Sequence, residues 1–351
     1  MPKPNVIVDR VRRLDLPVHP MVAAQGNGVP AHATVYLMGS AALLDLNDPR
    51  AAIWEGLFDE LRHTNDPVYL ETDPNTNVIK QVLYPQSVTV AGIALAPVGN
   101  LHEIELEISQ ARHYLRTTNP DYQQLLTALT VAHQHGTPVL VTENLDDHEI
   151  IDVRPGPAPF VAGPAMMATT SAGPSANLPL APVPVSLQQA QQLFTLVTSQ
   201  SYIPFKYPDD GCWGRAHEMS RLMIASAIQH RKVWIYGHLR VSTRNNPHCS
   251  VTWGWHVAPT LLVTIGSNTE IHVIDPSLFT GPVPQATWTG VQHDPTASLH
   301  DTDASVFYRS ASGHVTYDSS YSQTQQVLAR YRRALALRTA QFGPPPYNNC
   351  P

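Results

Sequence analysis

The sequence predicts an α+β fold built from two domains, and three features of the chain support this. Its 351 residues exceed the typical length of one domain, about 150 residues. A stretch rich in proline and alanine, residues 155–185, carries no charged residue and favours an extended connector between helix and strand patterns on either side. We therefore divide the chain into an N-terminal domain (1–154), a linker (155–185) and a C-terminal domain (186–351). The alternative is a long loop within a single domain.

The N-terminal domain is predicted to form a separate α+β unit. Asp48 and Asn119, each followed by proline, begin two helices with apolar residues at helical spacing, and Gly136 ends the second. The predicted strands are 33–38, 78–84, 87–95 and 137–142. We find no catalytic constellation in this domain, because His133 and His135 lie two residues apart on a helix and face different directions.

The C-terminal domain is predicted to pack a helix on an antiparallel sheet. Ser186 caps a helix over 187–199, and a second helix begins at Cys212. The predicted strands are 232–236, 255–265 and 270–275, of which the last two are joined by a turn at 266–268. A final helix over 322–339 ends before Gly343 and three prolines. This order of elements is typical of an α+β core.

Composition narrows the classes of function. Charged residues make up 14% of the chain and the formal net charge is -6, so we expect no nucleic-acid partner, which would require clustered positive charge. No stretch approaches about 18 consecutive apolar residues, so we expect no membrane span. The first ten residues carry acidic and basic side chains where a secretory signal peptide would be apolar, so no signal peptide is predicted.

The cysteines suggest one disulfide and one free thiol. Cys212, Cys249 and Cys350 are too few and too far apart for a zinc ribbon or a disulfide scaffold. Cys249 and Cys350 are the candidate disulfide, which would leave Cys212 free.

Cys212 is the candidate nucleophile, because it lies where a loop becomes a helix. Asp209 or Asp210 is the predicted N-cap, and Gly211 permits a tight approach. The sulfur shares one helix face with the apolar residues that follow, and the positive end of the helix dipole favours the thiolate. The alternative is a structural buried cysteine.

His256 and Asp275 are the candidate partners of this thiol. His256 begins an apolar strand, and an imidazole there could lower the pKa of the thiol and later protonate a leaving group. Asp275 ends the next strand, where a carboxylate could hold the second imidazole nitrogen. If the two strands form a hairpin about the turn at 266–268, the two residues lie almost opposite each other, because their midpoint falls at that turn.

Other residues compete for these roles. His217 lies about 140° around the helix from Cys212, and His272 faces the other side of its strand. His238 and His248 lie in loop-like sequence and are weaker candidates. Asp210 could orient the imidazole in place of Asp275, although capping already accounts for it.

Three tryptophans lie near these positions in the sequence. Trp213, Trp253 and Trp255 are candidates for the wall of a substrate groove. Packing in the core is an equally good interpretation of Trp253 and Trp255.

The same residues carry a resemblance to a known family. Residues 210–219 read Asp-Gly-Cys-Trp-Gly-Arg-Ala-His-Glu-Met, residues 255–258 read Trp-His-Val-Ala, and residues 273–279 read Val-Ile-Asp-Pro-Ser-Leu-Phe. Over about residues 186–350, this pattern resembles bacterial protein-glutamine glutaminase, a protein deamidase. Gly214 stands where that pattern has alanine.

The resemblance implies a transglutaminase-like, papain-related fold and hydrolysis of the side-chain amide of protein-bound glutamine to glutamate and ammonia. It assigns Cys212, His256 and Asp275 as a catalytic triad that acts through a thioester. No cofactor and no metal are expected, because the thiolate itself is the nucleophile. The expected partners are proteins or peptides with an accessible glutamine.

Several alternatives remain open from sequence. A transglutaminase, a cysteine protease or a peptide N-glycanase could use the same triad, and the C-terminal domain could instead be a non-catalytic binding module. The resemblance implies a secreted or exported protein whose residues 1–154 form an inhibitory pro-region. A targeting role for those residues and a cytoplasmic location are the alternatives.

Overall fold

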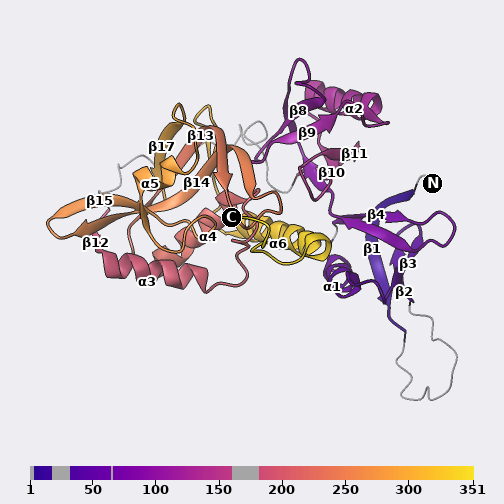
Figure 1. Ribbon diagram of the computed structural model, residues 1–351, viewed down its shortest axis with the longest axis horizontal. Coiled ribbons are helices and arrows are strands. Elements are labelled where there is room, and N and C mark those ends of the chain that lie inside the picture. The colour runs from indigo at the N-terminus through magenta and orange to yellow at the C-terminus, as the bar shows by residue number, and fades with distance from the viewer. Residues whose placement is uncertain (1–3, 18–31, 65, 160–181) are drawn as a thin grey trace, which may run out of the picture.

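The computed structural model describes residues 4–17, 32–64, 66–159 and 182–351. It is a mixed α+β structure whose strands pair antiparallel, apart from β12 (Val185–Ser186) and a few isolated bridges. Figure 1 shows three groups of elements, two before the predicted linker and one after it. The predicted linker joins β11 (Ile150–Pro155) to β12, and its residues 160–181 lie outside the described part of the chain.

The first lobe, residues 4–84, is an antiparallel sheet with one helix packed on it. Its elements are β1 (Asn5–Asp15), β2 (His32–Leu37), β3 (Ala41–Asp45), α1 (Ala51–Leu61), β4 (Pro67–Thr72) and β5 (Ile79–Leu83). The strand order is β3-β2-β1-β4-β5, and the apolar face of α1 packs on this sheet. The helix begins two residues after Pro49. Asp48 accepts a hydrogen bond from the Arg50 N–H at 2.8 Å and holds a turn at this point.

The second lobe, residues 86–155, has an apolar core of its own. Its elements are β6 (Gln86–Val88), β7 (Val90–Ile93), β8 (Leu101–Leu106), β9 (His113–Arg116), α2 (Tyr122–His135), β10 (Val139–Glu143) and β11. They form one sheet in the order β11-β10-β6 and another in the order β7-β8-β9. Gly136 ends α2 with a φ of 60°, as predicted, whereas the predicted strand 87–95 is divided between β6 and β7 at Thr89.

The C-terminal part, residues 182–351, packs helices on a larger sheet. Its elements are β12, α3 (Leu187–Thr198), α4 (Cys212–Ala225), β13 (Arg231–Ser242), β14 (Ser250–Ile265), β15 (Asn268–Val273), β16 (Val283–Pro284), α5 (Gln285–Gly290), β17 (Ser298–Asp303), β18 (Val306–Arg309), β19 (Val315–Tyr317) and α6 (Ser322–Phe342). The main sheet has the order β16-β15-β14-β13-β17. Ser186 and Gln189 form a capping box at the start of α3, which confirms the predicted helix start.

Two helices of this part pack closely on each other. The buried face of α4 shares an apolar core with β14 and with α6. Gly214 lies at the contact between α4 and α6, where a Cβ would come within 2.5 Å of Val327 Cγ1. Glycine at this position therefore lets the two helices approach each other.

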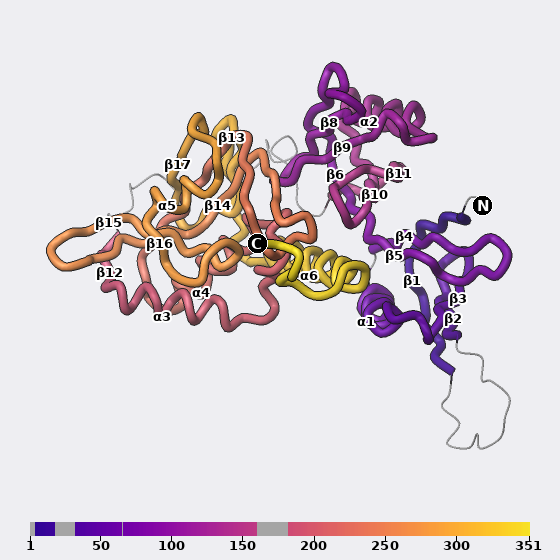
Figure 2. The backbone as a smooth tube through the Cα atoms, in the orientation of Figure 1, coloured from indigo at the N-terminus to yellow at the C-terminus, as the bar shows by residue number. Residues whose placement is uncertain are grey.

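The last helix joins the C-terminal part to the first lobe. Figure 2 shows α6 running from the middle of the molecule toward α1, and Leu337 of α6 lies in the core of the first lobe. Arg333 of α6 also donates to Glu60 at 2.9 Å and to Asp66 at 2.7 Å. The first lobe is thus attached by apolar contacts and by a partly buried ion pair. Among the described helices, none has both the length and the apolar character required to cross a bilayer.

A disulfide closes the C-terminal part. Cys249 and Cys350 are joined, with a Cα–Cα distance of 5.1 Å and a separation of 101 residues along the chain. Because a cross-link over a long loop reduces the conformational freedom of the unfolded chain, it stabilises the folded state.

We expect Cys350→Ser to lower the free energy of unfolding by about 2–4 kcal/mol, because the variant loses this constraint on the unfolded chain. Denaturant unfolding without reductant measures the change. The matched control is the unaltered protein in reductant, which should unfold at the midpoint of the variant. Equal midpoints for the oxidised protein and the variant would contradict a stabilising disulfide.

Candidate active site

Cys212 is the first residue of α4 and follows a sharp turn of the chain. The N-cap is Gly211 with a φ of 82°, a conformation that favours glycine, and a Cβ there would collide with the ring of Tyr331. The prediction that Asp209 or Asp210 caps this helix is wrong, because no side chain in the described chain caps it. The turn instead depends on glycine.

The thiol of Cys212 is deeply buried, with 1% of the residue exposed. Burial raises the pKa of the Cys212 thiol well above its usual value, and the charge of Arg215 lowers that pKa only in part. In this arrangement the thiolate is therefore disfavoured, contrary to the expectation drawn from the helix dipole. Desolvation by the surrounding chain outweighs the position at the helix end.

His256 of β14 and Asp275, just after β15, are in direct contact. His256 Nε2 lies 2.8 Å from Asp275 Oδ2, and the indole N–H of Trp288 donates to the same oxygen at 2.9 Å. Burial raises the pKa of Asp275, but the contacts with His256 and Trp288 outweigh it and hold that pKa below its usual value. The strand register differs by two residues from the predicted midpoint, because Thr260 pairs with Val273. The bend after β15 brings Asp275 back to the imidazole.

The imidazole of His256 is fixed between aromatic rings and the start of α4. Its ring stacks on Trp253, with centroids 4.4 Å apart, and on Trp288, with centroids 5.6 Å apart. The backbone of Val257, the next residue, lies close enough to Cys212 to lower the pKa of its thiol. Within the described residues, Nδ1 of His256 is buried without a hydrogen-bond partner. This nitrogen therefore has no hydrogen bond within the described residues to give up before it acts on another group.

A segment of the second lobe lies along β14 at this point. The Gly254 N–H donates to the Gln110 carbonyl at 2.9 Å. The Trp255 indole N–H donates to the Ser109 carbonyl, also at 2.9 Å. Ala111 adds an isolated antiparallel bridge to β14. Residues 109–111 thus bind to β14 in the manner of a short added strand.

The side chain of Gln110 reaches the start of α4. Its Oε1 accepts a hydrogen bond from the Cys212 backbone N–H at 2.8 Å, and its Nε2 donates to the Pro208 carbonyl at 3.1 Å. The residue is 0% exposed. A primary carboxamide is therefore held with its oxygen on the backbone N–H of the candidate nucleophile.

Asp210 holds this segment in place. Its Oδ1 accepts from the N–H groups of Gln110 at 3.0 Å and Gly211 at 2.8 Å. Its Oδ2 accepts from the hydroxyls of Ser109 at 2.6 Å and Tyr331 at 2.7 Å. None of these four partners is His256, so the geometry gives no support to the alternative in which Asp210 orients the imidazole.

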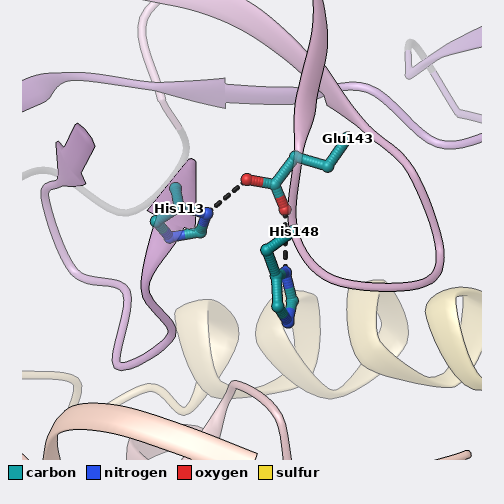
Figure 3. Close-up of side chains that lie close together, drawn as sticks. All are labelled: His113, Glu143 and His148. Atoms are coloured by element: carbon teal, nitrogen blue, oxygen red, sulfur yellow. Dashed lines mark hydrogen bonds and ion pairs between the residues drawn. The ribbon is translucent and has the colours of Figure 1, made fainter. Parts of the chain in front are cut away.

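A second contact between the lobe and the C-terminal part contains two histidines. Figure 3 shows Glu143 between His113 and His148, with one carboxylate oxygen directed at each ring. His113 Nε2 lies 2.8 Å from the Ser109 hydroxyl, and His148 Nε2 lies 3.7 Å from Asp209 Oδ1. Asp209 also forms an ion pair with the buried Arg338. Ser109 and Asp209 are therefore linked through these three side chains.

The charges of this cluster favour an ion pair. Burial disfavours the charged form of His148, but the nearby carboxylates of Asp209 and Glu143 raise its pKa to about 10. Burial also disfavours ionised Glu143, but His113 and His148 lower its pKa to about 2. The ligand atoms of His113, Glu143 and His148 lie within 4.8 Å of one another and could approach a metal ion. Both Glu143 oxygens already bind imidazoles, which favours the ion pair.

The remaining candidates are distributed over the core and the surface. Trp255 lines a groove of about 820 Å³ that also borders Gln110. Trp253 instead stacks on His256, and Trp213 packs in the core against Trp255. The four rival histidines have partners elsewhere, which are Lys232 for His217, Glu270 for His272, Arg112 for His238 and Asp146 for His248.

Sequence reasoning missed two participants in this site and gave a third a different role. Gln110 carries no motif, and its place depends on how the second lobe docks. Asp210 was interpreted as a cap, and Trp288 lies in a short helix that was not predicted.

The chain is similar to a known family and to solved structures. A family described as Glutaminase matches residues 190–292, a range that contains Cys212, His256 and Asp275. No curated sequence gives a significant match. Crystal structures of pro-protein-glutaminase and of a mutant of it are each 26% identical to the chain with a TM-score of 0.53. Each match covers 71% of this chain. It covers 92% of the pro-protein-glutaminase chain and 93% of the mutant chain.

A third solved structure is shorter. Protein-glutaminase from Chryseobacterium proteolyticum is 32% identical to this chain, with a TM-score of 0.39. The match covers 43% of this chain and 88% of that protein. The matches to the pro-forms cover a larger share of this chain than residues 182–351 make up. The likeness therefore extends to residues before the linker. The mixed α+β fold is similar to theirs, and the chain belongs to the protein-glutaminase family.

Proposed function

We propose that the protein hydrolyses the side-chain amide of protein-bound glutamine, with Cys212 as nucleophile, His256 as acid and base, and Asp275 as the residue that orients His256. One observation carries this proposal, which is the Gln110 carboxamide bound with its oxygen 2.8 Å from the Cys212 N–H. A glutamine of a substrate protein could enter in the same way if its backbone added to β14. Membership of a family of glutamine deamidases supports the same reaction.

The proposed reaction has two steps. The Cys212 sulfur attacks the carboxamide carbon, the C–N bond breaks, and His256 protonates the nitrogen so that ammonia leaves. Water, deprotonated by His256, then cleaves the thioester and releases glutamate. The Cys212 N–H would stabilise the oxyanion in both steps, as it now binds the Gln110 oxygen. Asp275 accepts from Nε2 and so directs Nδ1 toward the reacting atoms.

The arrangement of elements supports a papain-related, transglutaminase-like core. The nucleophile begins a helix, the histidine lies on a strand packed against that helix, and the acid follows the neighbouring strand. The orientation of Gln110 also favours a side-chain amide over a backbone amide as substrate, because its side-chain oxygen binds the Cys212 N–H. Transglutamination would use the same thioester with an amine in place of water.

We also propose that the residues before the linker form an inhibitory pro-region. Residues 109–111 occupy the edge of β14 beside Cys212, and Gln110 fills the position of a substrate side chain. The likeness to pro-protein-glutaminase supports this division of the chain. A substrate could then bind only after this segment has left the groove.

The first test concerns the proposed triad. In chains cut within residues 155–185, we expect Cys212→Ala to lose at least about 10³-fold in ammonia release, and Asp275→Asn about 10²-fold, because nucleophile and orientation are removed. The substrate is a peptide with the sequence of residues 106–114, and ammonia is measured by a coupled assay.

Two controls accompany this test. His272→Gln removes a buried histidine of the neighbouring strand and should retain activity, and a peptide with asparagine in place of Gln110 should release little ammonia. Full activity of Cys212→Ala would exclude the mechanism. Backbone fragments, or cross-links to an added lysine, would instead indicate a protease or a transglutaminase.

The second test concerns inhibition by the pro-region. We expect cutting the chain within residues 155–185 to raise the rate by about tenfold or more on dilution, because the pro-region then loses the high effective concentration of a tethered ligand. The uncut chain at the same dilutions is the control and should stay slow. A rate that neither cutting nor dilution changes would favour a targeting or partner-binding role for residues 1–154.

The third test concerns pH. The ion pair of His148 with Asp209 requires protonated His148, whose pKa is raised from 6.5 to about 10. Its contribution to docking is therefore complete below about pH 6.5 and is lost as the pH rises toward 10. We expect the cut pro-region to bind more weakly across this range. Binding is measured by fluorescence anisotropy in the Cys212→Ala background, so that catalysis plays no part.

The matched variant is His148→Gln, which keeps a polar side chain but cannot be charged. It should bind more weakly at pH 6 and show a flatter pH dependence. An identical pH dependence in both proteins would remove this ion pair from the docking contact.

A further inference from the structure

We infer that the first glutamine deamidated by this protein is its own Gln110, in a single intramolecular turnover while the pro-region is docked. The inference rests on the proposed function and adds a modification site in the same chain. It makes Gln110 a bound substrate in addition to a blocking side chain.

The contacts of Gln110 are those of a substrate ready to react. Its carbonyl oxygen lies on the Cys212 N–H, and its amide nitrogen donates to the Pro208 carbonyl, so both ends of the carboxamide are held. The backbone is fixed by the N–H bond to Asp210 and by the carbonyl bond from Gly254. Holding a carboxamide in one orientation beside the nucleophile removes the entropy cost of a bimolecular encounter.

A segment that only blocks the site does not require a carboxamide side chain. An apolar side chain could fill a buried site equally well, whereas a glutamine supplies the electrophile for which the site is built. The free Nδ1 of His256 and the Asp275 contact on Nε2 are also present in the docked state. The described structure therefore contains a nucleophile, an acid and base, an oxyanion donor and an amide together.

The reaction balances with water as the second reactant. A bond forms between the Cys212 sulfur and Gln110 Cδ, the bond from Cδ to Nε2 breaks, and the thiol proton leaves with the nitrogen as ammonia through His256. Water then adds to Cδ, the bond from carbon to sulfur breaks, and its proton returns to the thiol. The products are a glutamate side chain at position 110 and ammonia, with Cys212 restored. The groove of about 820 Å³ beside Gln110 and Trp255 is the route for water.

The turnover should be slow. Burial raises the pKa of the Cys212 thiol, and each unit by which that pKa exceeds the pH lowers the thiolate fraction about tenfold. We therefore expect Gln110 to be deamidated during a long incubation and not during purification.

The product would weaken its own docking. After conversion, a carboxylate oxygen replaces the amide nitrogen that donates to Pro208, so two acceptors face each other. The new charge also lies close to the buried carboxylate of Asp210, to which residue 110 is bound through its backbone. Burying a second like charge is unfavourable. Deamidation of Gln110 would therefore promote release of the pro-region.

Peptide mapping by mass spectrometry tests the inference on the uncut, full-length chain. After incubation at pH 8, we expect the peptide that holds residue 110 to become about 1 Da heavier, as glutamine becomes glutamate. Gln123 and Gln124, exposed on α2, are internal references and should remain amides. The same peptide from Cys212→Ala should not change.

A mixing experiment separates reaction within one chain from reaction between chains. Isotopically labelled Cys212→Ala chain is incubated with unlabelled active chain, and residue 110 is mapped in each. Conversion in the active chain alone supports the inference. Conversion in the labelled partner at the same rate overturns it, because Gln110 would then be an ordinary substrate between molecules.

The remaining outcomes separate this inference from the proposed function. If Gln110 stays an amide while the cut chain deamidates the peptide of residues 106–114, the inference fails and the proposed function stands. If neither reacts, the proposed function fails as well. A chain about 17 Da lighter, with residues 110 and 212 joined, would show that the thioester forms but is not hydrolysed. This outcome overturns the inferred conversion of Gln110 to glutamate.

Paired variants test the effect on docking. In the cut Cys212→Ala chain, we expect Gln110→Glu to bind the pro-region at least about tenfold more weakly than Gln110→Met, which keeps the length of the side chain without a charge. Equal affinities would overturn the proposed release.

Discussion

A buried carboxylate requires hydrogen-bond donors, and at Asp210 this requirement connects segments that are far apart in the sequence. Its two oxygens accept from the loop before α4, from Tyr331 of α6 and from residues 109–110 of the second lobe. An unsatisfied carboxylate in this position would cost several kcal/mol, so the three segments assemble around it together. The start of α4, and with it Cys212, is fixed by the same carboxylate that binds residues 109–110 of the second lobe. The position of residues 109–110 and the position of Cys212 therefore depend on the same carboxylate.

The docked arrangement has opposite effects on binding and on reactivity. Gln110 places a carboxamide on the Cys212 N–H, while burial of the thiol disfavours the thiolate. A site can thus be assembled in full and still react slowly.

The residues before the linker are held at more than one place. The second lobe contacts the site through residues 109–111 and through the His113, Glu143 and His148 cluster beside Asp209. The first lobe is held by α6, where Leu337 enters its core and Arg333 pairs with two carboxylates. Because α6 also supplies Tyr331 to Asp210, one helix touches both attachments. Loss of one attachment need not release the other.

The sequence alone determined the local structure and the chemistry of single residues. Proline starts, glycine stops and apolar periodicity located most helices and strands, because these signals act over a few residues. The residue types of Cys212, His256 and Asp275 indicated their chemistry, and the turn between the last two strands brought His256 near Asp275. The two-residue difference in register was not readable, because it depends on where the hairpin ladder ends.

Only the tertiary structure decided what faces the thiol. Gln110 lies 102 residues from Cys212 in a segment without any motif, and its position results from the docking of a lobe with its own core. The role of Asp210 and the pKa of Cys212 follow from that docking, because hydrogen bonding and desolvation depend on neighbours in space. Such neighbours are set by the burial of whole surfaces, which no short stretch of sequence encodes.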